Sequence, residues 1–326
     1  MSTARTSSSR RRVTSGEWFA EGIRRPYDPT TGELLHRAGP RSLHVWERVV
    51  AGADPVAGRW ITMLPGFPDG SYGYAQVDAA LGVGADPRLH VEFLGHGDSD
   101  KPRRYAYSTA ERADLVLAHW AAHRVDETFV VAFDYATLVV LELLARHQEG
   151  RAELPRITGV LLANGGLFTD AHTHPWQTTP FMQTRAGRAT ALAQYSPAVF
   201  RAVLRLSRMY SPDHDLRRDE LDDWFAVMSR RDGMHVLHAA SAFVNDHRAQ
   251  GDRLDFARLH RAYRDVIAFT VSGAEGDVLE GRQTTAARDR LGPAGLDVRL
   301  HPGGHLTTHE HPDLLAGTIR ELTARR

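Results

Sequence analysis

Asp134 is the residue of this chain whose setting points most clearly to chemistry. It stands in the stretch VVAFDYA (130–136), where an apolar run predicts a strand and the residues from Leu138 onward predict a helix. A reactive residue at the tip of a strand–turn–helix needs small neighbours two positions before and after it, and Ala132 and Ala136 meet that need. Glycine is more usual there, so two alanines strain or open the turn. The alternative is that Asp134 only N-caps the helix from Tyr135.

His305 supplies a candidate base. It closes the run Gly303-Gly304-His305 after the last predicted strand and precedes a helix that starts near Pro312. An imidazole titrates near neutral pH and can remove a proton from water. The neighbouring histidines at 301, 309 and 311 suggest a metal cluster as an alternative, but no carboxylates are arranged to complete one. We therefore expect no metal and no cofactor.

A carboxylate should orient this imidazole, and two candidates follow the strand predicted over residues 266–271. The loop reads SGAEGDV (272–278), with Asp277 as the first choice and Glu275 as the second. Either residue could instead be a plain surface charge. The order along the chain, with Asp134 first, an acid after a later strand and His305 near the end, is the order found in α/β-hydrolase folds.

The side-chain type at position 134 selects the reaction. Serine there would attack a carbonyl group, whereas an aspartate attacks an sp³ carbon that carries a leaving group or a strained ring, and forms an ester on itself. His305 would then activate the water that hydrolyses this ester. The loop PGFPD (65–69) should complete the site, because the backbone N–H groups of Phe67 and Tyr135 would converge as an oxyanion hole.

The elements that must position these residues follow a regular rhythm. Apolar runs that are continuous rather than alternating indicate strands buried on both faces, and interleaved helices indicate a mostly parallel central sheet flanked by helices. A half-exposed strand is predicted over residues 43–49 and a closing helix over 312–323. The buried strands are predicted over residues 59–64, 89–94, 128–133, 157–163, 266–271 and 296–300.

Residues 167–263 break this rhythm, with helical patterns and no convincing strand. We interpret them as a helical cap inserted over the carboxyl ends of the strands, where open α/β sheets place their ligands. The core domain then comprises residues 16–166 and 264–326, and residues 1–15 form a disordered basic tail. The residues expected to contact a small-molecule substrate are Trp176, Tyr195, Tyr210, Trp224 and Asn164.

Composition excludes several other classes of protein. The 40 Lys and Arg balance the 40 Asp and Glu, which gives no support for nucleic acid as a partner. The chain has no cysteine, so disulfides, thiolate nucleophiles and Cys-ligated zinc are ruled out. No apolar run is long enough for a membrane span, and the three arginines at 10–12 lack the apolar stretch of an export signal. We expect a cytoplasmic protein, and a homodimer remains open.

Three segments resemble the haloalkane dehalogenase and epoxide hydrolase branch of the α/β-hydrolases. They are LPGFP (64–68), FLGHGDSDKP (93–102) and FDY (133–135), and the segments NGGLF (164–168) and HP (174–175) resemble the mesoderm-specific transcript proteins within it. The resemblance extends from about Trp18 to the C-terminus. It implies the fold, the helical cap and a hydrolase role for Asp134, Asp277 and His305.

Some positions depart from the pattern of that branch. Pro65 replaces its usual histidine, and Phe133 and Ala136 replace histidine and glycine beside the nucleophile. Tyr135 stands where dehalogenases of the branch carry a halide-holding tryptophan, which argues against a dehalogenase. Epoxide hydrolases use cap tyrosines as proton donors, and the candidates are Tyr195, Tyr210 and Tyr263.

The leading hypothesis is therefore hydrolysis of an epoxide through an ester on Asp134. A dehalogenase or another hydrolase working with the same residues is one alternative. A fold relative that no longer hydrolyses anything, and serves as a binding protein or a biosynthetic catalyst, is the other.

Overall fold

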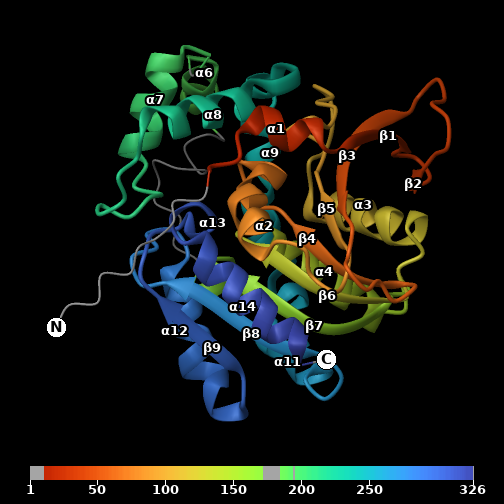
Figure 1. Ribbon diagram of the computed structural model, residues 1–326. Helices are drawn as coiled ribbons and strands as arrows, with labels where there is room; N and C mark the ends of the chain where they lie inside the picture. Colours follow the sequence, from red (N-terminus) through yellow and green to blue (C-terminus); the bar gives the residue numbers. More distant parts are fainter. Residues whose placement is uncertain (1–10, 172–183, 194, 326) are drawn as a thin grey trace.

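The computed structural model describes residues 11–171, 184–193 and 195–325, and within these ranges nine strands form one sheet (Figure 1). The strands are β1 (Ile23–Asp28), β2 (Glu33–Leu34), β3 (Leu43–Val50), β4 (Arg59–Leu64), β5 (Arg88–Val91), β6 (Glu127–Phe133), β7 (Arg156–Ala163), β8 (Ala268–Ala274) and β9 (Asp297–His301). Their order across the sheet is β2-β1-β3-β5-β4-β6-β7-β8-β9. The pairs from β5 to β9 are parallel, and those that join β2, β1, β3 and β5 are antiparallel.

The predicted α/β-hydrolase architecture is confirmed, and each buried strand predicted from an apolar run is present. The pair β1 and β2 was missed, because two arginines and a proline (Arg24, Arg25 and Pro26) hide β1 from a hydrophobic pattern. Strands near the edge of a sheet tolerate charged residues and proline, since fewer of their amides must pair.

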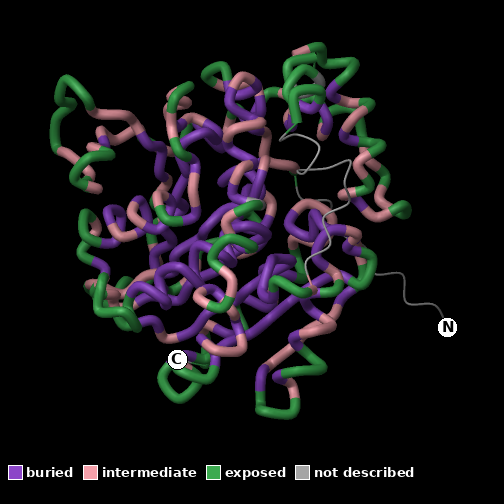
Figure 2. The backbone as a smooth tube through the Cα atoms, turned by 180° about the vertical axis from the view of Figure 1, so that it is seen from behind, coloured by how far each residue is buried: buried purple, intermediate pink, exposed green. Residues whose placement is uncertain are grey.

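Helices cover both faces of the sheet. Helix α2 packs against α14 on one face, and α3 packs against α4 on the other. The strands lie in the buried interior, while exposed residues gather in the outer helices and loops (Figure 2). The helices of the core are α1 (Ser15–Ala20), α2 (Ala75–Leu81), α3 (Thr109–Ala122), α4 (Ala136–Gln148), α12 (Gly281–Leu291), α13 (Thr307–Glu310) and α14 (Pro312–Ala324), with the 3₁₀ turns η1 (Gly70–Tyr74) and η6 (Gly292–Ala294). Among the described residues, no helix has the length and apolar character needed to cross a membrane.

A long helical insertion separates β7 from β8. Its elements are η2 (Thr169–Ala171), α6 (Arg185–Ala193), α7 (Pro197–Leu206), α8 (Arg218–Ser229), η3 (Arg230–His235), α9 (Leu237–Ala240), η4 (Ser241–Phe243), α10 (Val244–Gln250), η5 (Gly251–Leu254) and α11 (Phe256–Tyr263). Helices α6, α7 and α8 lie together beyond one end of the sheet (Figure 1). The last part of the insertion differs from the expected cap, because η5 and α11 pack against α4 of the core.

The N-terminal segment is more ordered than expected. Thr14 caps α1, and the Ser15 hydroxyl donates to Asp223 of α8 over 2.8 Å. The Arg12 guanidinium also pairs with Asp223, at 2.5 Å. Residues 11–15 were predicted to belong to a disordered tail, but they join the core to the insertion.

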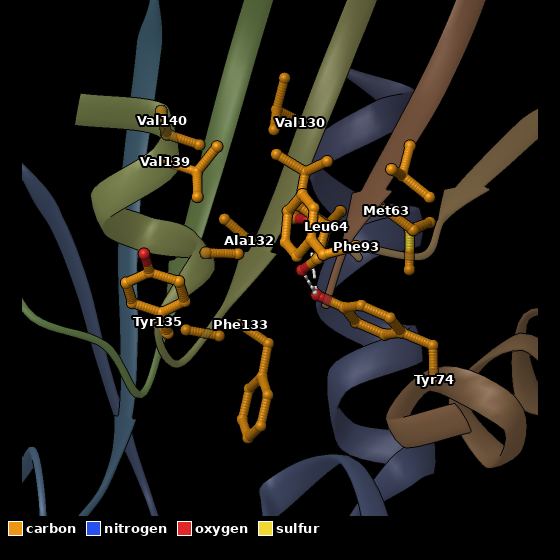
Figure 3. Close-up of a cluster of buried hydrophobic side chains, with 14 of the residues drawn as sticks. Met63, Leu64, Tyr74, Phe93, Val130, Ala132, Phe133, Tyr135, Val139 and Val140 are labelled. Carbon is orange, nitrogen blue, oxygen red and sulfur yellow. Dashed lines mark hydrogen bonds between the residues drawn. The ribbon is translucent and has the colours of Figure 1, made fainter. Parts of the chain in front are cut away.

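The parallel arrangement places the carboxyl ends of β4, β6, β7 and β8 at one edge of the sheet. Leu64 at the end of β4 pairs in register with Ala132, and Ala163 at the end of β7 pairs with Phe133. The Tyr74 hydroxyl donates to the carbonyl of Leu64 at 2.9 Å and lies 3.4 Å from that of Val131, which ties these two strand ends together (Figure 3). The loops that follow these strands therefore meet over the edge.

Candidate active site

Asp134 occupies the sharp turn between β6 and α4. Its backbone is left-handed, with φ at +51°, a conformation that costs a residue with a side chain of order 1–3 kcal/mol. The strain is held by hydrogen bonds, because the Asp134 amide donates to Ala163 at 2.8 Å and its carbonyl accepts from the Thr137 hydroxyl at 2.8 Å. The N-cap of α4 is Tyr135, so the alternative that Asp134 merely caps this helix is wrong.

Two glycines make room for this turn. A β-carbon on Gly66 would lie 2.9 Å from the Asp134 β-carbon and 2.8 Å from the Phe133 ring. A β-carbon on Gly165 would lie 2.3 Å from the Asp134 carbonyl oxygen. All three distances are far below van der Waals contact, so only glycine allows the neighbouring loops to approach the turn this closely.

The Asp134 carboxylate faces the loop that was expected to form the oxyanion hole. The Phe67 amide donates to Oδ2 of Asp134 at 2.8 Å. The second expected donor, the amide of Tyr135, directly follows Asp134 at the amino end of α4. An amide in this position can stabilise negative charge on the same oxygen once the carboxylate has been converted into an ester.

His305 lies between two carboxylates and is buried. Its Nε2 is 3.3 Å from Oδ1 of Asp134, an ion-pair distance without the alignment of a hydrogen bond. Its Nδ1 lies 3.1 Å from each carboxylate oxygen of Asp277. Burial alone would lower the pKa of His305, but the negative charges of Asp277 and Asp134 and the hydrogen bond with Asp277 outweigh it and hold the pKa well above its usual value.

Asp277 is the acid that contacts this imidazole. Its Oδ1 accepts from the amides of Leu279 at 2.8 Å and Glu280 at 3.0 Å. Burial acts to raise the pKa of Asp277, but His305 and these hydrogen bonds bring it below the ordinary value. Glu275, the second choice, is exposed, and its backbone amide donates to the carbonyl of His301 at the end of β9 over 2.9 Å.

Asn164 supports the acid from the end of β7. Its Nδ2 donates to Oδ2 of Asp277 at 3.0 Å, and its Oδ1 accepts from the Thr307 hydroxyl at 3.2 Å. Asn164 was expected to contact substrate, but its amide group is used by these two partners. Its backbone, like that of Asp134, is left-handed, with φ at +48°. Nothing in the strand-ending pattern NGG pointed to this supporting contact.

The expected substrate residues of the insertion divide into groups. Trp224 and Tyr210 are both buried, and the Trp224 indole N–H donates to the Tyr210 hydroxyl at 2.7 Å. The Tyr195 hydroxyl instead bonds to Asp232 within the insertion. Tyr263 donates to Leu144 on the core helix α4, away from the site. Trp176 lies outside the described residues.

Phe243 is a site residue that the sequence pattern did not reveal. Its ring centroid lies 5.3 Å from that of Phe67 and 3.4 Å from that of Tyr135. It therefore covers both residues of the expected oxyanion hole from the side of the insertion. A single aromatic residue in a long helical stretch gives no periodic signal that separates a site wall from ordinary packing.

A second acid–imidazole pair lies beside the first. Nε2 of His309 is 3.2 Å from Oδ2 of Asp69, and both side chains are buried. The pair joins the loop of Phe67 to the loop of His305. His301 and His309 thus have separate surroundings, and the described residues hold no group of three His, Asp or Glu side chains suited to a metal ion.

Two cavities bear on where a substrate enters. One, of about 880 Å³, lies at the amino ends of the strands, lined by residues such as Arg59, Glu127 and Arg156, and so lies at the wrong end of the sheet for Asp134. The other, of about 460 Å³, lies between the end of α7 and the core loop of Gly276 and Val278. This smaller cavity is lined by Tyr210 and by the two residues on either side of Asp277.

Fold and chain order agree with a comparison against known families. Residues 63–318 match the model of the Alpha/beta hydrolase family, and the chain belongs to that family. A nucleophile position after a central parallel strand, an acid after a later strand and a histidine near the end are the arrangement that such a fold provides.

The chain is also similar in sequence to individual proteins. It is 28% identical to a putative hydrolase LipZ of Mycobacterium tuberculosis over 312 residues, which cover 92% of this chain and 93% of that protein. It is 27% identical to the mesoderm-specific transcript protein of Mus musculus over 221 residues, or 66% of this chain. The match spans 63% of the mouse protein, which is less than two thirds of its length.

Solved structures share the fold at low sequence identity. The epoxide hydrolase VrEH1 of Vigna radiata has a TM-score of 0.63 and 16% identity, with 94% of this chain and all of that chain covered. A bromoperoxidase of Bacillus anthracis has a TM-score of 0.65 and 11% identity, with 93% and 100% covered. Proteins of different activities thus share this architecture, and the reaction must be argued from the site itself.

Proposed function

We propose that the protein hydrolyses an epoxide through a covalent ester on Asp134. The observation that carries the proposal is the setting of the Asp134 carboxylate, held in a strained turn between the Phe67 amide and Nε2 of His305. A carboxylate in the position of a nucleophile favours attack on an sp³ carbon, and a strained three-membered ring supplies both the electrophile and the leaving oxygen.

In the first step Oδ1 of Asp134 attacks a ring carbon. One carbon–oxygen bond forms, the ring carbon–oxygen bond breaks, and the released alkoxide takes a proton. We choose Tyr210 from the three candidate tyrosines, because its hydroxyl accepts from Trp224 and keeps its own proton to give, whereas the hydroxyls of Tyr195 and Tyr263 bond to Asp232 and Leu144. Its backbone carbonyl carbon also lies within 2.7 Å of where a β-carbon on Gly304 would stand, next to His305.

In the second step water hydrolyses the ester. His305 takes a proton from the water through Nε2, and the oxygen attacks the carbonyl carbon of Asp134. The amides of Phe67 and Tyr135 hold the negative charge that develops on the former Oδ2. Collapse of this intermediate breaks the bond to the alkyl oxygen, which takes the second proton of the attacking water and leaves as the diol, so that the carboxylate is restored. The proton held by His305 then returns to the phenolate of Tyr210, while Asp277 keeps the imidazole oriented and stabilises its charged form.

Ester formation also prepares His305 for its role. The Asp134 charge is one of the causes that raise the pKa of His305. The ester carries no charge, so this cause disappears and the pKa of the imidazole falls toward the range of a base. The nucleophile therefore controls when the base becomes active.

A dehalogenase is less well supported by the same geometry. Its halide would need hydrogen-bond donors next to the nucleophile, but the Tyr135 hydroxyl is paired with Thr109 at 2.9 Å. The Tyr135 ring is also covered by Phe243.

The test is to trap the ester. The His305→Gln variant incubated with styrene oxide should gain the mass of one substrate molecule, located on Asp134 by peptide mapping. A single turnover of the unmodified protein in oxygen-18 water should place the label in the Asp134 carboxylate rather than in the diol. Absence of an adduct and of turnover across a panel of epoxides and alkyl halides would favour a non-hydrolytic relative.

A further inference from the structure

Arg112 is a buried cation whose hydrogen-bonding capacity is largely unused. It lies on α3 and is 0% exposed. Its Nη2 donates to the Ala240 carbonyl over a long 3.3 Å, and its Nε and Nη1 have no partner among the residues that the structure describes. Removing a charge from water is unfavourable unless the charge is paired and hydrogen-bonded. This position therefore calls for an acceptor that the described chain does not provide.

The guanidinium lies on the aromatic wall of the candidate site. Its central carbon is 4.3 Å from the ring centroid of Tyr135 and 5.4 Å from that of Phe243. Tyr135 directly follows Asp134, and Phe243 also contacts Phe67. Arg112 thus packs against residues that flank the reactive carboxylate, at the junction between core and insertion.

None of the described carboxylates lies within ion-pair distance of Arg112. Burial raises the pKa of Glu111 to about 8 although the charge of Arg112 acts to lower it, and the Glu111 carboxyl accepts from the Tyr105 hydroxyl at 3.1 Å. Asp246 accepts from the backbone amide of Thr109 at 2.7 Å. His96 is kept uncharged, because burial, Arg112 and Lys101 all lower the pKa of its imidazole.

We propose that Arg112 binds a carboxylate group of the substrate, so that the epoxide hydrolysed at Asp134 is an epoxy acid. This inference rests on the proposed function for its reaction, but not for its binding step. The planar guanidinium offers parallel N–H donors that match the two oxygens of a carboxylate. The ring of Phe243 would pack on the hydrocarbon between the carboxylate and the epoxide. Arg112 is then a residue that determines specificity.

The test is a binding experiment with two probes of equal shape, phenylacetate and phenylacetamide. Neither contains an epoxide, so the result does not depend on whether Asp134 forms an ester. Calorimetry should show that Arg112→Met weakens the binding of phenylacetate by about 10–100-fold, because a charge-assisted hydrogen-bonded pair is lost. The binding of phenylacetamide should weaken far less. Arg103→Met is the matched control, because Arg103 is exposed and pairs with Asp232.

Two results would overturn the proposal. One is an unmodified protein that binds phenylacetate no better than phenylacetamide, and the other is an Arg112→Met variant that keeps the preference for phenylacetate. If Arg112→Met does not fold by circular dichroism, Arg112→Lys answers the same question. Lysine keeps the positive charge but lacks the two parallel N–H donors of the guanidinium. The binding of phenylacetate should therefore weaken several-fold, and the binding of phenylacetamide should not change.

Trapping experiments keep the two proposals apart. If styrene oxide forms an ester on Asp134 but the protein does not prefer phenylacetate over phenylacetamide, the proposed epoxide reaction is supported and the proposed role of Arg112 is wrong. If the preference for phenylacetate depends on Arg112 but no epoxide reacts, the proposed binding site is supported and the proposed reaction is wrong.

Discussion

The backbone amide of Phe67 donates to Oδ2 of Asp134 at 2.8 Å, across 67 residues of sequence. This contact distinguishes the two carboxylate oxygens. Oδ2 is held by the amide and remains the carbonyl oxygen of an ester, whereas Oδ1 faces His305 and is the atom that attacks. The loop of Phe67 must therefore stay close to the turn of Asp134 for the proposed reaction to proceed.

Gly66→Ala should separate these two loops. The new methyl group would stand 2.9 Å from the β-carbon of Asp134, so the loop or the turn must shift. We expect kcat for styrene oxide to fall about 10²–10³-fold, the cost of losing one oxyanion donor. Gly317→Ala is the control, because a β-carbon there has no atom within 4 Å and alanine favours a helix. Unchanged kcat in Gly66→Ala would show that the Phe67 amide is not needed.

Asp277→Asn and Glu275→Gln test the choice of acid. Asn at 277 cannot stabilise the charged imidazole, so kcat should fall by about 10⁴-fold, as when the acid of a triad is neutralised. Glu275 is exposed and outside the site, so Glu275→Gln should retain full kcat and KM. Equal losses in the two variants, measured by steady-state kinetics, would mean that His305 does not depend on Asp277.

The pKa of His305 should fall when the Asp134 charge is removed. Asp134→Asn mimics the uncharged ester, and nitrogen-15 NMR of the imidazole can follow the titration. An unshifted pKa in this variant would contradict the link between ester formation and the base. In the reacting protein, ester hydrolysis should slow as pH falls below the reduced pKa of His305, because only the neutral imidazole accepts a proton.

The same shift has a consequence for folding. The pKa of His305 is raised in the folded protein above the value of about 6.5 for an unfolded chain. Its stabilising contribution is therefore complete below that value and is lost as pH rises through the folded pKa. Urea unfolding at pH 6 and pH 9 should show a larger decrease in the unfolding free energy for the unmodified protein than for His305→Gln.

Tyr210→Phe should slow ring opening. Burial raises the pKa of Tyr210 well above its ordinary value, so its hydroxyl keeps a proton to donate at neutral pH. In the His305→Gln background, which stops at the ester, we expect adduct formation with styrene oxide to slow about 10²-fold. Tyr195→Phe is the matched control, because its hydroxyl bonds to Asp232. Equal adduct rates in both variants would remove Tyr210 from the reaction.

Much of this architecture can be predicted from patterns of neighbouring residues in the sequence. Continuous apolar runs specify the buried parallel strands, and the chain order of Asp134, Asp277 and His305 follows from the loops after those strands. The choice between Asp277 and Glu275 was beyond the pattern, because it depends on where β8 stops and which way the next residues turn. Asn164 was expected at the site but in contact with substrate, and Phe243 and Arg112 were missed. The reason is related, since the partners of these residues come from segments far away in sequence.

At position 134, the left-handed backbone makes thermal stability and catalysis favour different residues. Asparagine adopts this conformation at lower cost than most residues and keeps the shape of the aspartate side chain. Selection of variants for survival at high temperature alone would therefore be drawn toward inactive proteins changed at position 134. Any effort to make this protein more robust should hold that position fixed and seek its gains far from the turn.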